Sequence, residues 1–295
     1  MDSQNISINK KEKTNIFRVE DKFIKLKSDY FLQELFDNLK KKKSLEIIKY
    51  NNNIKRRLNI NINDYKEYSE TYSSIEIEII PIKNIYGKFI NIDPGNYYYH
   101  IYFNNNKEEI ERNYLDIEDN VTNIKIIINY QINNFFRLFS ECECIKSVNF
   151  KKFCRNNIID MSFMFWKCSS LQEIIFSNFN SNNVTNMSYM FCQCKSLKEL
   201  DLSKFYTNNV TSMRGMFSFC TSLEKINLSH FNTNKVFDMT YMFCHCSSLR
   251  GIDISNFNIG DKTAIVSMFY GLSDELIMNI KNQIKNLNEL AFIEN

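Results

Sequence analysis

Met187-Ser-Tyr-Met-Phe-Cys-Gln-Cys194 is one of four similar octapeptides that recur at a fixed interval in the second half of the chain. The other three are Met161-Ser-Phe-Met-Phe-Trp-Lys-Cys168, Met213-Arg-Gly-Met-Phe-Ser-Phe-Cys220 and Met239-Thr-Tyr-Met-Phe-Cys-His-Cys246, so the interval is 26 residues. A constant interval of this size is typical of proteins built from stacked, similar supersecondary units. Stacked units usually form a surface that holds another molecule, so the repeat favours binding over catalysis.

The apolar residues within each octapeptide have the spacing of a helix. Met187, Met190, Phe191 and Cys194 stand at positions i, i+3, i+4 and i+7, which lie on one face of an α-helix. The residue before each octapeptide has a side-chain oxygen suited to a helix N-cap. These residues are Asp160, Asn186, Ser212 and Asp238. The pattern predicts a helix of about two turns in each unit, held in place by packing.

After each octapeptide the apolar spacing changes to alternation. Leu200 and Leu202 flank Asp201, as they would in a strand with one buried face. Equivalent stretches occupy residues 171–176, 223–228 and 249–254. The Asn- and Thr-rich segment that follows each strand is suited to turns, because Asn tolerates left-handed conformations.

The full pattern runs from Val184-Thr-Asn-Met-Ser-Tyr-Met-Phe191 to Leu200-Asp-Leu-Ser-Lys-Phe205. It resembles the 26-residue BspA-like leucine-rich repeat, which is common in mycoplasma surface proteins and in several protists. Residues 135–272 carry the resemblance. It implies a leucine-rich-repeat-like solenoid with a binding or adhesive role, and it does not imply an enzyme.

We therefore predict an α+β repeat fold: a leucine-rich-repeat-like solenoid with a short helix and a strand in each 26-residue repeat. A small helical region and a β-rich capping region should precede it. The predicted segments are a disordered polar tail (1–25), a small helical region (26–65), a β-rich N-terminal cap (72–131), the solenoid (132–272) and a C-terminal capping helix (273–295).

The stretch Tyr30-Phe-Leu-Gln-Glu-Leu-Phe-Asp-Asn-Leu39, followed by Ser44-Leu-Glu-Ile-Ile48, resembles an F-box within residues 29–58. The shared pattern is an apolar helix, a short polar link and a second apolar helix. The usual Leu-Pro start of an F-box is absent, and Asp29-Tyr30 stands in its place. The resemblance implies a ubiquitin-ligase adaptor with a Skp1-like partner, whose solenoid would hold the substrate. The alternative is a helical module with a packing role only.

The residues that could carry chemistry do not form a catalytic or metal-binding pattern. Five of the nine cysteines recur once per unit, at Cys142, Cys168, Cys194, Cys220 and Cys246, and are interpreted as small buried core residues. The usual Cys-x2-Cys spacing of a zinc site is absent. The three histidines match no triad, and the six glycines form no phosphate-binding loop. We predict no enzymatic activity, no cofactor and no metal.

Alternate side chains of the predicted strands should point away from the core. These columns differ between units while the core columns barely change, which indicates a surface not fixed by packing. We predict that this mildly acidic face binds a protein partner of unknown identity, and its charge favours a basic one. The alternative is a solvated sheet face. The candidate partner-binding residues are Glu173, Ile175, Glu199, Asp201, Lys225, Asn227 and Asp253.

The net charge of +3 is unevenly distributed, since residues 1–60 contain 15 Lys and Arg against 8 Asp and Glu. We interpret this basic region as a solvated face and expect no nucleic-acid partner. The N-terminus lacks the apolar core of a signal peptide, and no apolar run is long enough to span a membrane. These features predict a cytoplasmic location. Three functions stay open: an interaction scaffold, an F-box-like adaptor, and a surface or adhesive protein like the secreted family members.

Overall fold

The computed structural model describes residues 29, 32, 33, 36, 52–61, 63–64, 73–93, 96, 98–130, 132–177, 179–284 and 287–294. The chain divides into two compact units, Met1–Tyr72 and Ser73–Asn295. The predicted polar tail and much of the F-box-like stretch lie outside the described residues. The F-box resemblance and its Skp1-like partner therefore stay predictions.

The described part of the first unit centres on helix α4 (Asn52–Arg57). Ile54 and Leu32 are fully buried, and Phe36 and Leu58 are nearly so. The Arg57 Nε atom lies 2.6 Å from the Asp29 carboxylate, which joins two segments 28 residues apart. Apolar burial and this ion pair together hold the described pieces of the unit.

The second unit begins with a five-stranded mixed sheet in the order β3-β5-β1-β6-β7. Its strands are β1 (Ile75–Pro81), β3 (Tyr99–Phe103), β5 (Ile124–Ile128), β6 (Ile145–Lys152) and β7 (Glu173–Phe176). The first four pair in antiparallel fashion, and β7 pairs in parallel with β6. Strands β1 and β5 alternate between buried Ile side chains and more exposed positions, so one face of the sheet joins the core. A small pair, β2 (Gly87–Lys88) with β4 (Tyr114–Leu115), adjoins it.

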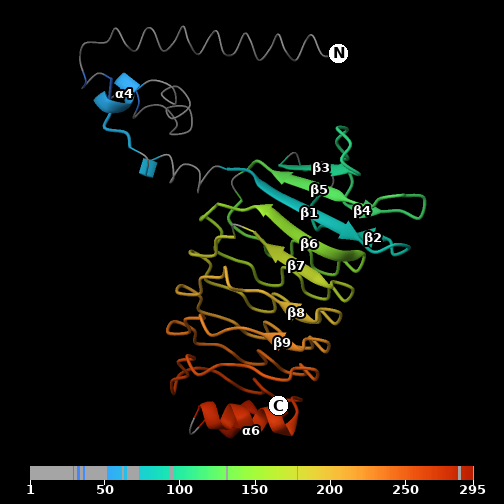
Figure 1. Cartoon of the computed structure of the whole chain (residues 1–295), viewed down its shortest axis with the longest axis vertical. Coiled ribbons are helices and arrows are strands. Elements are labelled where there is room, and N and C mark those ends of the chain that lie inside the picture. Colours follow the sequence, from blue (N-terminus) through green and yellow to red (C-terminus); the bar gives the residue numbers. More distant parts are fainter. Residues whose placement is uncertain are drawn as a thin grey trace. The chain divides into compact units, whose positions relative to one another are not determined.

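Beyond β7 the chain forms 26-residue units that contact one another through very short parallel pairings. Strands β8 (Glu199–Leu200) and β9 (Lys225–Ile226) pair in parallel. A second line of isolated parallel bridges joins Asp160 to Asn186 and Asn186 to Ser212, and continues to Asp238 and Ala264. Figure 1 shows β7, β8 and β9 following one another towards helix α6 (Asp274–Gln283).

The predicted fold class is wrong. The described part of the chain is mostly β-structure in mixed and two-stranded sheets, and it does not form the predicted leucine-rich-repeat-like solenoid of helix and strand. Among residues 132–177 and 179–272, no α-helix forms, and the octapeptides are successive tight turns. Helices with defined bounds in the described residues are α4 and α6, besides a short 3-10 turn, η1 (Glu289–Ala291).

Backbone conformation explains why the octapeptides are not helical. Tyr189 and Gln193 have φ angles of 56° and 63°, in the left-handed region that an α-helix excludes. The N–H groups of Tyr189 and Phe191 donate to carbonyls of the next unit, at Arg214 and Met216, over 2.7 and 2.9 Å. The intervening N–H groups bond three residues back, as that of Met190 does to Met187. The apolar spacing therefore predicts the buried side chains correctly, but the predicted helical backbone is wrong.

The core of the 26-residue units is a stack of phenylalanine rings. Phe191 lies 5.7 Å from Phe165 and 5.7 Å from Phe217, centroid to centroid, with interplanar angles of 6° and 7°. The same series continues through Phe243 to Phe269. Stacked pairs contribute about 0.5–1.5 kcal/mol each beyond the area that they bury. Buried Met side chains line the neighbouring positions, at Met161, Met164, Met187, Met190, Met213, Met216, Met239, Met242 and Met268.

The last unit is covered by the C-terminal segment. The N–H groups of Ser267 and Phe269 donate to Leu290 and Ala291, so this segment satisfies the edge of the stack. Phe292 extends the ring stack, with its centroid 5.6 Å from that of Phe269. Helix α6 begins after Ser273, whose hydroxyl accepts from the Leu276 N–H, and buries Leu276 and Ile280. None of the helices in the described part of the chain has the length and apolar character that a bilayer crossing requires.

Candidate partner-binding surface

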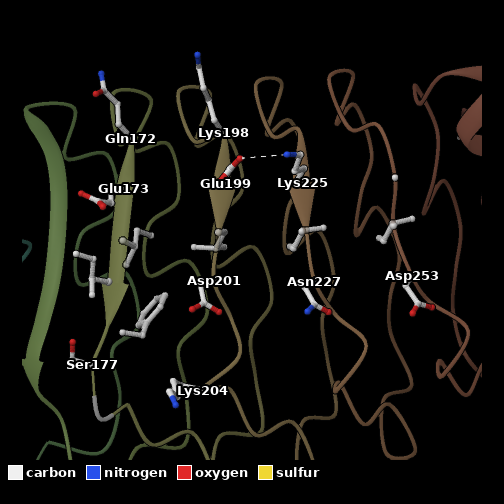
Figure 2. A pocket seen from close by; sticks show the side chains of 17 residues that line it. Gln172, Glu173, Ser177, Lys198, Glu199, Asp201, Lys204, Lys225, Asn227 and Asp253 are labelled. Carbon is white, nitrogen blue, oxygen red and sulfur yellow. Dashed lines mark ion pairs between the residues drawn. The ribbon is translucent and has the colours of Figure 1, made fainter.

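An open groove with a volume of about 1210 Å³ lies over β7, β8, β9 and the adjoining stretch 251–253. We call it the strand-face groove and define it by residues 172–177, 198–201, 204, 225–227 and 251–253. All seven candidate residues from the sequence line it: Glu173, Ile175, Glu199, Asp201, Lys225, Asn227 and Asp253. Figure 2 labels the polar ones among them and shows Asp201, Asn227 and Asp253 in one row across successive units.

Strand alternation places the candidate side chains on the outer surface. In β7, Ile174 and Phe176 are buried, whereas Glu173 and Ile175 are exposed. The pairing of Glu199 with Lys225 and of Lys225 with Gly251 keeps equivalent positions in one row. Ile175 is 40% exposed, so the groove offers one apolar side chain among polar ones.

The groove carries charges of both signs. Its carboxylates are Glu173, Glu199, Asp201 and Asp253, and its ammonium groups are Lys198, Lys204 and Lys225. The carboxylate of Glu199 lies 4.0 Å from the Lys225 Nζ atom (Figure 2), with both side chains more than two-thirds exposed. Because an exposed pair of this kind contributes little to folding, these charges are free to meet a partner.

Turn chemistry explains one row that the sequence suggested was unconstrained. The side-chain oxygen of Asp201 accepts from the Ser203 N–H at 2.9 Å. In the same way Asn227 accepts from the Ser229 N–H, and Asp253 accepts from the Ser255 N–H. Asp or Asn is needed here for an Asx turn at the strand end. The recurring Asp/Asn-x-Ser triplet is the sequence signal that would have revealed it. Variation between Asp and Asn in this row is therefore no evidence of binding.

The same hydrogen bonds keep two groove carboxylates ionised. The Ser203 backbone N–H and hydroxyl lower the pKa of Asp201 below its ordinary value. The Ser255 hydroxyl and N–H lower the pKa of Asp253 in the same way. The row that contains Glu173, Glu199, Lys225 and Gly251 makes no such turn bond among the hydrogen bonds described, so it is the freer part of the groove.

The chemistry-bearing residues elsewhere are mostly committed to structure. The buried thiols of Cys168, Cys194, Cys220 and Cys246 donate to main-chain carbonyls. His230 Nε2 lies 2.8 Å from the Leu202 carbonyl oxygen, and His100 lies beside Glu109. Within the described ranges, no three His, Cys, Asp or Glu side chains gather in a way that could hold a metal ion.

A stack of 26-residue units bearing an open, mixed-charge groove defines a repeat-containing protein. The family described as "Mycoplasma protein of unknown function, DUF285" matches residues 133–229 and 224–290. These matches cover more than half of the chain, so the chain belongs to this family. No curated protein and no solved structure matches the chain. The expected relation to a mycoplasma protein family is confirmed at that level.

Proposed function

We propose that this protein is a non-enzymatic interaction scaffold whose strand-face groove holds an extended, basic segment of a protein partner. The observation that carries the proposal is the convergence of Glu173, Glu199, Asp201 and Asp253 on one open concave surface. The groove crosses four successive units, and at a strand spacing of about 4.8 Å these span roughly 14 Å. That is the length of about four extended residues. The site is therefore suited to a short linear segment.

The chemistry of the groove favours a partner with Lys or Arg beside an apolar residue. Ile175 supplies an exposed apolar contact, and the carboxylates of the groove supply partners for cations. The three lysines of the groove disfavour a uniformly basic stretch, because like charges repel. Charge pattern contributes specificity and association rate more than it contributes affinity.

The test compares charge reversal inside and outside the groove. Glu173→Lys combined with Glu199→Lys, two positions that make no Asx turn, should abolish capture of a partner that the unaltered full-length chain retains in quantitative affinity purification. The matched control is Glu118→Lys with Asp261→Lys, which changes two exposed carboxylates outside the groove by the same total charge. A partner lost by both double variants, or by neither, would contradict binding through the groove.

A second candidate function is adhesion at a cell surface. The match to a mycoplasma protein family favours it, because the 26-residue pattern also resembles the BspA-like repeat of mycoplasma surface proteins. Brief protease treatment of intact cells separates this candidate from a scaffold with a cytoplasmic location. Loss of the chain from intact cells, while a cytoplasmic marker survives, would support adhesion; survival of both would support the cytoplasmic scaffold.

A further inference from the structure

A second concavity, of about 340 Å³, lies at a different corner of the 26-residue units. We call it the aromatic pocket, and it shares no residue with the strand-face groove. Six rings line it: Trp166, Tyr189, Phe219, Tyr241, His245 and Tyr270. Its volume falls near the lower end of the range for small-molecule sites.

Small residues at one recurring position open the pocket. Cys192, Ser218 and Cys244 stand in three successive units where the units before and after them carry Trp166 and Tyr270. Gly215 stands where the neighbouring units carry Tyr189 and Tyr241. A Cβ atom on Gly215 would lie 2.4 Å from the Tyr189 ring, so that ring occupies the space over the glycine. The three small residues thus leave the recess, and Gly215 leaves room for the Tyr189 ring that forms one of its walls.

The rings of the pocket are held in defined positions. The Arg214 Nε atom donates to the Tyr189 hydroxyl at 2.9 Å. His245 stacks on Phe219 with centroids 4.6 Å apart and meets Tyr270 edge-on at 5.0 Å. A Cβ atom on Gly271 would lie 2.6 Å from the His245 ring, so this glycine accommodates the imidazole. Rings fixed before binding reduce the ordering cost of a ligand.

The charge of the pocket favours a cation. Glu294 is the carboxylate in the lining, and it accepts a 2.9 Å hydrogen bond from the neutral Tyr270 hydroxyl. Two neighbouring cations, Lys167 and Arg214, lie outside the lining and have carboxylate partners. Lys167 is 3.6 Å from Glu141, and Arg214 is 3.4 Å from Asp238. The Glu294 charge therefore faces the pocket without a cationic partner among the described ion pairs.

Rings of this pocket already lie close to cations of the protein. The Arg137 guanidinium carbon lies 5.5 Å from the Trp166 ring centroid. The Lys167 Nζ atom lies 4.1 Å from the Trp166 ring centroid, and the Arg214 guanidinium carbon lies 5.3 Å from that of Tyr241. Aromatic faces bind cations within about 6 Å through the ring quadrupole. A quaternary ammonium group cannot donate an N–H hydrogen bond, so aromatic faces and a nearby carboxylate are the groups that suit it.

We propose that the aromatic pocket binds a small quaternary ammonium compound of the choline type. Its trimethylammonium group lies against the rings over Ser218, and Glu294 supplies the compensating charge at the rim. The site is distinct from the proposed protein-binding groove, so either assignment can fail without the other.

The single tryptophan of the chain, Trp166, gives a direct readout. Titration of the full-length protein with choline should change its fluorescence saturably. The matched probe is 3,3-dimethyl-1-butanol, in which carbon replaces the charged nitrogen. We expect the affinity for this neutral analogue to be lower than that for choline by about tenfold or more. It has the same shape but lacks cation–π and ionic attraction.

Substitutions separate charge from shape. Glu294→Gln should weaken choline binding by about tenfold and leave the neutral analogue unchanged. Ser218→Phe should fill the recess and abolish binding of both, whereas Glu118→Gln, at an exposed carboxylate outside the pocket, should change neither. Equal affinity for choline and its neutral analogue, or the absence of saturable binding by the folded protein, would overturn the proposal. Binding of a trimethyllysine peptide without binding of choline would overturn the small-molecule assignment.

Discussion

The Sγ atom of Cys220 lies 3.0 Å from the carbonyl oxygen of Phe191, which belongs to the preceding 26-residue unit. The same relationship joins Cys194 to Phe165 at 3.2 Å and Cys246 to Phe217 at 3.0 Å. Each thiol is fully buried, so it fills a small space and also donates a hydrogen bond between units. A cysteine is suited to this position because it combines small size with a weak donor.

Cys220→Ala should lower the free energy of unfolding by about 1–2 kcal/mol, because it removes a buried atom and an interunit hydrogen bond. Urea unfolding followed by circular dichroism measures the change. Cys154→Ala is the matched control, since Cys154 is partly exposed and is not one of the cysteines that recur once per unit. Equal losses in the free energy of unfolding from both substitutions would show that the recurring cysteine position has no special role.

Stability should fall in mildly alkaline solution. Burial raises the pKa of Cys144 to about 11 and that of Cys192 to about 12. It also raises the pKa of the Cys220 thiol well above its ordinary value. An unfolded thiol has a pKa of about 8.5, so the unfolded state loses protons first as the pH rises. The stability that the protonated thiols contribute is therefore complete below about pH 8.5 and declines towards the folded-state pKa values.

The expected result is a lower urea midpoint at about pH 10 than at about pH 8. Cys192→Ala should make that decline shallower by removing one of the contributing thiols. A midpoint that stays constant across this range would contradict the assignment of buried, protonated thiols.

Arg155 should be essential for joining the first strands to the 26-residue units. Its buried guanidinium donates to the carbonyls of Ser73, Tyr130 and Ile128, the last at 3.0 Å. Arg155→Met should cost about 3–5 kcal/mol, because it leaves these carbonyls without that donor. Thermal unfolding measures the loss. Arg250 is largely exposed and pairs with Glu224, so Arg250→Met should shift stability by no more than about 0.5 kcal/mol.

The Asx turns at the strand ends should be detectable separately from the surface charges. Asn227 accepts from both the N–H and the hydroxyl of Ser229, at 3.1 and 2.8 Å. Asn227→Ala should cost about 1 kcal/mol, whereas Asn227→Asp should be nearly neutral because Asp makes the same turn at neighbouring strands. Glu199→Ala serves as a surface control, and a cost as large as that of Asn227→Ala would argue against the turn as the cause.

Part of the strand-face groove could be predicted from the sequence because strand alternation is a local property. Glu173 and Glu199 each precede a buried strand residue, Ile174 or Leu200, and the 26-residue interval places them in register. The helix prediction failed because spacing reports which side chains are buried and not which carbonyls the backbone chooses. Met187 and Phe191 are buried as they would be on a helix, yet their N–H groups bond to the next unit.

The sequence by itself determined the 26-residue interval, the buried Met, Phe and Cys positions and the outward side chains of the strands, because each follows from local pattern. Only the tertiary structure decided the mixed sheet, the hydrogen bonds of Arg155 and the rings that surround Gly215 and Ser218. These features depend on contacts between residues of different units and strands. Their energies arise only when the chain has brought distant donors, acceptors and rings together, so no local pattern reveals them.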